Sequence, residues 1–416
     1  MSEITRTEPI RPSIANLMPP AMVDSLQRRA LLAGVIAALL CILGAATHPH
    51  QFLRSYLVGY IMGLGLSLGS LGLLMVQYLT KGNWGFLIRR QLEAGSRVLP
   101  LMAILFIPLG IGVWNHNLYP WANTKLLSPE DLQQFKMRAY LTPQWFIVRA
   151  IVYFALWIVL AYFLNKWGKQ QDYEDVPDLP RSRRYQKLCG PGLVLFCITV
   201  TMAVVDWIMS LDIHWYSTMY GLIFIDGQGL ITMCFMIMLT AALFKYRPMS
   251  QVLVPKTLHD LGNLTLAMVM LFAYFSFSQF LIIWSGNLPE EIHWYVDRLK
   301  GAWASVAFAI VLFHFAIPFF LLLHKPIKRN LKTLVPVVVI LFLARYIDLL
   351  WYIVPNFNHM VNGVSDPRGA FSWMDLACPV AVVGLWIAAF CGQLKSRPLF
   401  PVYDPLWTEV EKLHGR

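Results

Sequence analysis

The sequence predicts an all-α integral membrane protein with ten transmembrane helices, and its composition and its apolar runs lead to that fold class. The chain has 416 residues, of which 57% are hydrophobic and only 14% are charged. Soluble proteins carry about 25% charged residues, so a mean hydropathy of +0.55 is typical of a membrane protein. A bilayer-spanning helix needs about 20 apolar residues. Ten runs meet this need: 30–47, 52–79, 97–115, 146–166, 190–210, 217–244, 260–285, 301–324, 331–354 and 373–394.

The chain divides into a membrane domain and two polar ends. Residues 1–29 form a polar arm, which we expect to be cytoplasmic. The run that follows is longer than the roughly 7–15 residues of a signal-peptide core, so it is interpreted as a first transmembrane helix. The membrane domain is predicted over 30–394, and a cytoplasmic tail over 395–416. The longest connections, 116–145 and 167–189, are too short for a soluble domain.

Lysine and arginine are unevenly distributed over the connections, and this predicts an orientation. With a cytoplasmic N-terminus, 25 of the 34 basic residues fall in cytoplasmic segments, seven on the outer side and two within spans. Cytoplasmic loops of membrane proteins carry such an excess. Both termini are therefore predicted to be cytoplasmic. The net charge of +11 is a topology signal, with contact to anionic lipids, and does not indicate nucleic-acid binding.

Two short patterns recur in the two halves of the chain. Ser55-x-x-x-Gly59 with Gly65 returns as Ser217-x-x-x-Gly221 with Gly227, and Trp114-x-x-Asn117-Leu118 returns as Trp284-x-x-Asn287-Leu288. Both recurrences fall at equivalent outer ends of spans. They predict two parallel four-helix units, spans 2–5 (about 52–210) and spans 6–9 (about 217–354), with spans 1 and 10 peripheral. Chance recurrence is the alternative.

Titratable residues in and beside the spans are the main functional signal. A charge near the bilayer centre costs about 2.5–3.5 kcal/mol or more, so such groups are usually functional. When these residues are placed along the spans at about 1.5 Å of rise per residue, their depths extend from the inner face of the membrane to its middle. We expect a proton path through Asp226, His259, Asp260, His314, Arg345 and Asp348. The alternative for Arg345 and Asp348, which are i and i+3 on one helix face, is a structural ion pair.

A second polar group is predicted near the outer ends of spans 2–5. Oxidation of a quinol needs hydrogen-bonding groups for the ring and a base that takes the protons. The candidate quinone site comprises His50, Arg54, Arg149, Tyr153, Asp206, Asp212 and His214. Taken singly, each is equally well explained as a snorkelling or hydrogen-bonded structural group. Asp212 and His214 also fit a water-exposed turn within an aromatic belt.

No redox centre or metal site is predicted on this chain. The six cysteines lie in or beside apolar runs without any C-x-x-C motif, so an iron–sulfur cluster or a structural zinc lacks ligands. We interpret these cysteines as small apolar residues. A membrane haem commonly needs histidine ligands, and only His314 lies well inside a span. If the chain takes part in electron transfer, its partners carry the centres and a diffusible quinone brings the electrons.

Two longer motifs carry a resemblance to a known family. Residues 207–221 read WIMSLDIHWYSTMYG and residues 48–59 read HPHQFLRSYLVG. Both resemble the signature of the NrfD/PsrC-like membrane subunits of alternative complex III, and the similarity covers nearly the whole chain. By its length the chain is most similar to the shorter, ActF-type subunits of that family.

The resemblance implies a membrane subunit of a bacterial quinol:electron-acceptor oxidoreductase, with cytochrome c or a similar acceptor, in the cytoplasmic (inner) membrane. It implies menaquinone or ubiquinone as the ligand and no covalently bound cofactor. Haem and iron–sulfur clusters would belong to the partners, which are an ActC-like membrane subunit, an iron–sulfur subunit and c-type cytochrome subunits. Whether this chain binds quinone or only conducts protons stays open.

Two other functions are compatible with the residues. The repeat and the buried charges suggest a stand-alone proton-coupled secondary transporter. Against it, no span is interrupted by paired Gly or Pro at corresponding positions of the two halves, which is the usual sign of a transporter site. The third possibility is a purely structural membrane anchor for redox subunits.

Overall fold

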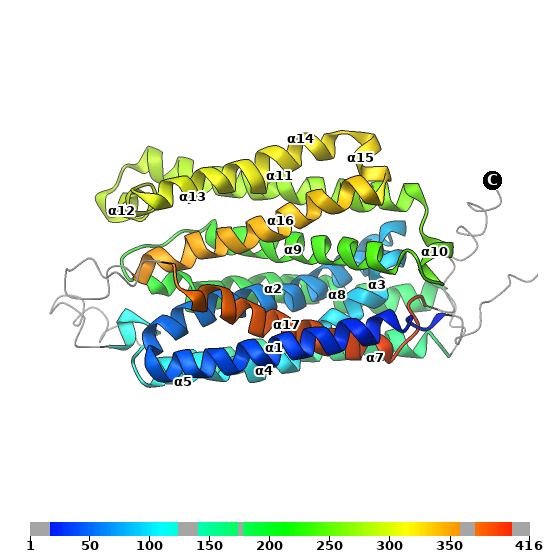
Figure 1. The fold of residues 1–416 in the computed structure, drawn as a ribbon, viewed down its shortest axis with the longest axis horizontal. Coiled ribbons are helices and arrows are strands. Elements are labelled where there is room, and N and C mark those ends of the chain that lie inside the picture. Colours follow the sequence, from blue (N-terminus) through cyan, green and yellow to red (C-terminus); the bar gives the residue numbers. More distant parts are fainter. Residues whose placement is uncertain (1–16, 124–139, 174–177, 358–370, 402–416) are drawn as a thin grey trace, which may run out of the picture.

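The computed structural model describes residues 17–123, 140–173, 178–357 and 371–401. These residues contain no strand, and their long helices run side by side along one axis (Figure 1). Ten helical segments are long and apolar enough to cross a membrane. The prediction of an all-helical, ten-span membrane protein is confirmed. Parts of the predicted terminal arm and tail, 1–16 and 402–416, lie outside the described residues.

The ten spans correspond one to one with the predicted apolar runs. They comprise α1 Met22–Thr47, α2 Pro49–Thr80, α3 Asn83–Ser96 with α4 Leu99–Leu105 and α5 Ile107–Trp114, α7 Pro143–Gln170, α8 Asp178–Trp207, α9 Tyr220–Leu243, α11 Pro255–Gly286, α13 Ala302–Ile310 with the π-helical η4 Val311–Ala316 and α14 Ile317–Leu323, α16 Leu331–Ile353, and α17 Trp373–Lys395. The connections contain η2 Pro120–Ala122, η3 Met209–Leu211, α10 Met249–Val252, α12 Pro289–Arg298, α15 Lys325–Arg329 and η5 Val354–Phe357. Three of the spans start with a proline, at positions 49, 143 and 255. Proline lacks a backbone N–H, and at the first position of a helix that group would make no intrahelical hydrogen bond.

Most of the spans begin before their predicted apolar runs, and α8 starts at Asp178 although its run was predicted from residue 190. The first starts at Met22, inside the predicted arm, and Asp24 in its first turn pairs with Lys395 of α17. The polar stretch 83–96, predicted as a cytoplasmic connection, forms the helix α3 ahead of the third span. The charged residues of α3 are buried because they pair inside the protein, as described below.

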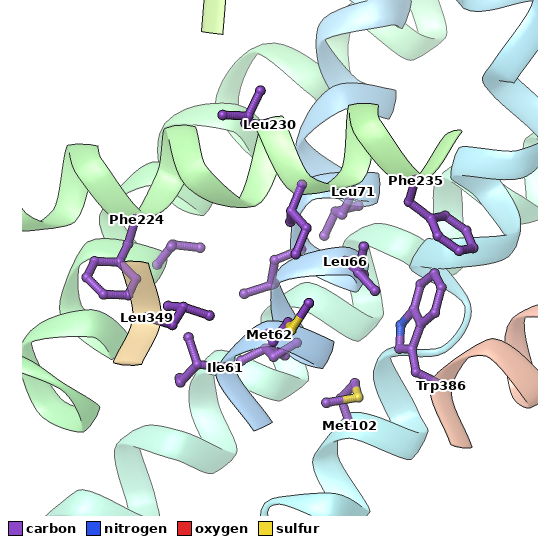
Figure 2. Packing of buried hydrophobic residues seen from close by; sticks show 14 of the residues in the cluster. Ile61, Met62, Leu66, Leu71, Met102, Phe224, Leu230, Phe235, Leu349 and Trp386 are labelled. Carbon is purple, nitrogen blue, oxygen red and sulfur yellow. The ribbon is translucent and has the colours of Figure 1, made fainter. Parts of the chain in front are cut away.

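The second span, α2, lies at the centre of the bundle, and its apolar window is entirely buried. Its glycines allow other helices to approach closely, as small residues do in membrane proteins. A Cβ at Gly59 would lie 2.7 Å from the nitrogen of Pro379 on α17, and one at Gly69 would lie 2.1 Å from the carbonyl oxygen of Gln228 on α9. Figure 2 shows this core, in which Phe235 of α9 meets the indole of Trp386 of α17 edge to face.

The outermost helices leave most of their apolar surface uncovered by the rest of the described chain. The apolar windows of α1, α11 and the α13–α14 span are only 22% buried within the protein. The two ends of the described chain lie on one side of the membrane, since the Leu399 N–H donates to the carbonyl of Leu17 at 2.8 Å. Which side this is stays a prediction. The division into two four-helix units also stays a prediction, because α2 packs on α9 of the second unit and on α8 of the first.

Candidate functional site

A buried group of titratable residues gathers where α9, η4 and α16 meet, and we call Asp226, His314, Arg345 and Asp348 the central cluster. Arg345 is its hub. Its guanidinium donates a hydrogen bond to the carboxylate of Asp348, one turn further along α16. The same guanidinium lies against Gly227 of α9, where an added Cβ would lie 2.4 Å from the Arg345 Cζ. A side chain at this position would require the guanidinium to shift from its present place.

Asp226 and Gln228 flank that glycine on α9. The Asp226 side chain is buried, and Arg345 is close enough to act on it electrostatically. Its Oδ2, and the Oε1 of Gln228, have no hydrogen-bond partner within the part of the chain that the structure describes. A buried polar atom without a partner costs about 1–3 kcal/mol. One such acceptor, on Asp226, therefore lies near the buried arginine, whereas the Gln228 side chain lies against Gly65 of α2.

His314 supplies the imidazole of the cluster. It is fully buried in the π-helical turn of the eighth span, with its ring centroid 4.0 Å from that of Phe272 on α11. Its Nδ1 lies 4.0 Å from the Oδ2 of Asp348, beyond hydrogen-bond distance. Neither ring nitrogen has a hydrogen-bond partner among the described residues. Single π-helical turns occur frequently at functional sites.

The central cluster can therefore hold a proton at more than one atom. A carboxyl group and an imidazole, both buried and both unsatisfied, lie around one guanidinium whose charge is already paired by Asp348. Asp and His side chains of this kind form the proton relays of membrane proteins. The predicted members Asp226, His314, Arg345 and Asp348 are thus brought together by the fold.

The inner residues of the predicted proton path lie on the first turns of α11. The His259 Nδ1 is 3.8 Å from the Asp260 Oδ1, and the Asn263 amide is 3.3 Å from the same ring nitrogen. Lys328 of α15 donates to the Asn263 Oδ1 at 2.6 Å. These side chains form a separate, partly exposed group at the helix end, and no described contact joins them to the central cluster.

The predicted quinone residues divide into several groups. Asp206 of α8 is fully buried and accepts from the Arg149 Nε at 2.8 Å, from its Nη2 at 3.0 Å and from the Tyr153 hydroxyl at 2.9 Å. We call these three residues the outer triad. Arg149 also stacks on the ring of Tyr140, at 3.8 Å from Cζ to the ring centroid. Both oxygens of the Asp206 carboxylate are occupied, so this part of the predicted site is a saturated ion pair.

The other predicted quinone residues have different partners. Arg54 donates to the Asp375 Oδ2 at 2.8 Å, and the hydroxyl of Ser55 donates to its Oδ1 at 2.5 Å, which ties α2 to the start of α17. The His50 Nδ1 lies 3.0 Å from the carbonyl oxygen of Asn117. Asp375 completes the ion pair of Arg54, but it was not among the predicted site residues.

The turn after α8 carries the remaining two predicted quinone residues, Asp212 and His214. The Asp212 Oδ2 lies 2.9 Å from the Nε2 of His293 on α12, and its Oδ1 accepts the backbone N–H of His214. His214 is exposed. This turn also buries Trp215, whose ring stacks on Trp294 with centroids 4.5 Å apart. The signature motif thus joins the loop after α8 to α12.

Two buried arginine groups were missed by the sequence reasoning. Arg90 of α3 pairs with Glu93 and Asp172, and Arg397 also reaches Glu93 at 3.2 Å. Arg298 of α12 donates to the carbonyls of Trp351 and Tyr352 at the end of α16. Burial lowers the pKa of the Arg298 guanidinium to about 10. In the sequence, the ion pair of α3 is indicated only by the i, i+3 spacing of Arg90 and Glu93. The polar composition of the same stretch also fits a loop between two spans.

No protein-family model matches the chain, and no curated protein matches it either. Among the described residues, no group of three or more His, Cys, Asp and Glu side chains is arranged to hold a metal ion. The central cluster and the two sequence motifs are therefore the features of the chain that bear on its function.

Proposed function

We propose that this chain is a proton-translocating membrane subunit, and that the central cluster is the site that exchanges the proton. The observation that supports this most directly is the pair of buried, unsatisfied acceptor groups on Asp226 and His314 around Arg345. Unsatisfied polar atoms are costly in a membrane interior. A protonated, neutral Asp226 is less costly to bury than its carboxylate, so the cluster can hold a proton at this side chain.

Each residue has a distinct role in the proposal. Asp226 takes up and releases the proton, because its Oδ2 has no hydrogen-bond partner among the described residues. Arg345 stays charged and is balanced by Asp348. Burial favours the neutral form of Asp226, and the positive charge of Arg345 favours the ionised form. His314 is the next acceptor, and His259 with Asp260 are the inner entry.

The wider setting is proposed from the resemblance. The chain would act in a bacterial quinol:electron-acceptor oxidoreductase of the cytoplasmic membrane, with both termini cytoplasmic. Quinol oxidation on the outer side, with menaquinone or ubiquinone as substrate, would drive the proton movement, while partner subunits carry the haems and iron–sulfur clusters. The motifs at 48–59 and 207–221 support this part. The outer triad, with its carboxylate saturated, supports a structural role better than direct quinol chemistry.

The test is Asp226→Asn in the intact complex reconstituted into vesicles. Asparagine keeps the shape of the side chain but cannot titrate. We expect a lower number of protons moved per electron, with normal assembly of the complex. Asp226→Glu is the matched control, because it keeps the carboxyl group and should retain more of the proton movement. Unchanged proton stoichiometry in Asp226→Asn, with normal turnover, would show that Asp226 is a structural group.

Purification separates this proposal from its alternatives. A subunit of a redox complex should co-purify with proteins that absorb as c-type haem, whereas a stand-alone transporter should be purified alone and without colour. A structural anchor would also co-purify with haem proteins, but its Asp226→Asn variant would move protons normally. The combination of haem colour and a proton defect is expected only for the proposed function.

A further inference from the structure

The first and last spans, α1 and α17, pack against each other along a seam of small residues. A Cβ at Gly384 would lie 2.9 Å from the Cα of Gly34, and one at Gly44 would lie 2.6 Å from the Sδ of Met374. These contacts give an antiparallel register. The described residues of α1 that are buried are Val23, Gly34, Ala37, Cys41 and Gly44. From Gly34 onward they are spaced three or four residues apart, so one narrow face of α1 holds the helix to the bundle.

Two thiols meet in the middle of this seam. Cys41 of α1 and Cys378 of α17 have their sulfur atoms 3.4 Å apart, and the Cys41 thiol donates to the Cys378 sulfur. Both residues are buried, and all six cysteines of the chain are free. A disulfide has a sulfur–sulfur distance of about 2.05 Å, so the two sulfur atoms, now 3.4 Å apart, must move closer for the bond to form. The backbones already approach closely at Gly34 and Gly384.

We propose that Cys41 and Cys378 form an oxidation site, at which a peroxide-class oxidant converts the two thiols into a disulfide that joins the first span to the last. Hydrogen peroxide is small and neutral, so it can enter the seam. The sulfur of one thiol attacks a peroxide oxygen, the O–O bond breaks, and sulfenic acid and one water are formed. The second thiol then attacks the sulfenic sulfur and releases a second water. Two thiols and one peroxide thus give one disulfide and two waters.

The position of the pair fits this chemistry. Cys41 lies six residues before the end of α1 and Cys378 five residues after the start of α17. At about 1.5 Å per residue, the sulfurs are roughly 8–9 Å from the helix ends. With the predicted orientation, those ends face the outer compartment, where disulfides form and persist. The bond would fix α1 to α17, whose Asp375 binds Arg54 of the central helix α2.

The experiment counts free thiols in the full chain, in native membranes, after exposure to hydrogen peroxide. The membranes are quenched and denatured in SDS, and the thiols are labelled with a maleimide polymer that shifts the gel band once per thiol. We expect the wild-type chain to change from six labels to four, and dithiothreitol to restore six. Peptide mass spectrometry should identify the crosslink between Cys41 and Cys378.

Serine variants make the result specific. Cys41→Ser and Cys378→Ser should each form no crosslink within the chain and lose at most one label after peroxide, because the remaining thiol can reach the sulfenic acid but has lost its partner. Cys189→Ser is the matched control and should fall from five labels to three, since its thiol is buried away from the seam. Six labels in peroxide-treated wild type, or a loss of two labels in Cys41→Ser, would overturn the proposal, as would a crosslink found only between two chains.

Discussion

The central cluster and the outer triad each place an arginine beside an aspartate, but they differ in how far the hydrogen bonds of their polar groups are satisfied. In the outer triad, Asp206 accepts three hydrogen bonds from Arg149 and Tyr153, and both carboxylate oxygens are used. In the central cluster, the Asp226 Oδ2 and both nitrogens of His314 have no partner among the described residues. Buried polar groups are usually satisfied.

The difference indicates two different uses of buried charge. A saturated ion pair gives a helix a defined neighbour, and removing one partner leaves a buried charge that costs several kcal/mol. An unsatisfied group costs stability in the resting protein but leaves an atom available for a proton. Among the described residues, the outer triad is a paired ion pair between α7 and α8, whereas in the central cluster Arg345 and Asp348 are paired and Asp226 and His314 keep unpaired atoms, which is why we propose the central cluster as the chemical site. Three predictions test this comparison.

The largest effect is expected for the ion pair between Arg345 and Asp348 in the central cluster. Arg345→Gln leaves the Asp348 carboxylate, which is 1% exposed, without its ion-pair partner. We expect a loss of about 4 kcal/mol in the free energy of unfolding, within the range for breaking a buried pair. SDS-induced unfolding of the purified protein measures it. Lys332→Gln, an exposed change on the same helix, should alter stability by less than about 0.5 kcal/mol. A small loss of unfolding free energy in Arg345→Gln would contradict a stabilising role for this ion pair.

A smaller loss is expected in the outer triad. Asp206→Asn removes the charge that balances Arg149, whose side chain keeps 16% exposure and so regains some hydration. We expect a loss of about 3 kcal/mol by the same measurement. In the fraction that assembles, proton movement per electron should equal that of the wild type. A stable Asp206→Asn protein with defective quinol oxidation would reverse the comparison and return the outer triad to the chemical site.

The smallest effect has the opposite sign. His314→Phe replaces an imidazole with two unsatisfied nitrogens by a ring that retains the contact with Phe272. We expect a gain of about 1 kcal/mol in stability, because an unsatisfied buried group is removed, together with impaired proton movement. His293→Phe is the control, since it breaks the bond to Asp212 and should give no gain. A destabilised His314→Phe protein would show that the imidazole has a hydrogen-bond partner in the folded state.

Local patterns in the sequence were enough to predict the spans. Each of the ten apolar runs became a helical segment, because the bilayer sets the length and backbone hydrogen bonding sets the helix. The i, i+3 pairing of Arg345 with Asp348 and the i, i+4 face of Arg149 and Tyr153 were also predictable, because one helix determines both spacings.

Partners between helices depended on the tertiary structure. Arg54 and Asp375 are more than 300 residues apart, as are Cys41 and Cys378, and no periodicity in one segment encodes such contacts. The sequence predicts a connection where the charged helix α3 lies. Burial of Arg90 requires its ion pairs with Glu93 and with the distant Asp172, and the second of these is not visible in a local pattern. The sequence by itself thus determined which segments are membrane helices. Only the packing of those helices decided which buried polar groups are paired and which are left unsatisfied, because hydrogen bonding is a property of neighbours in space.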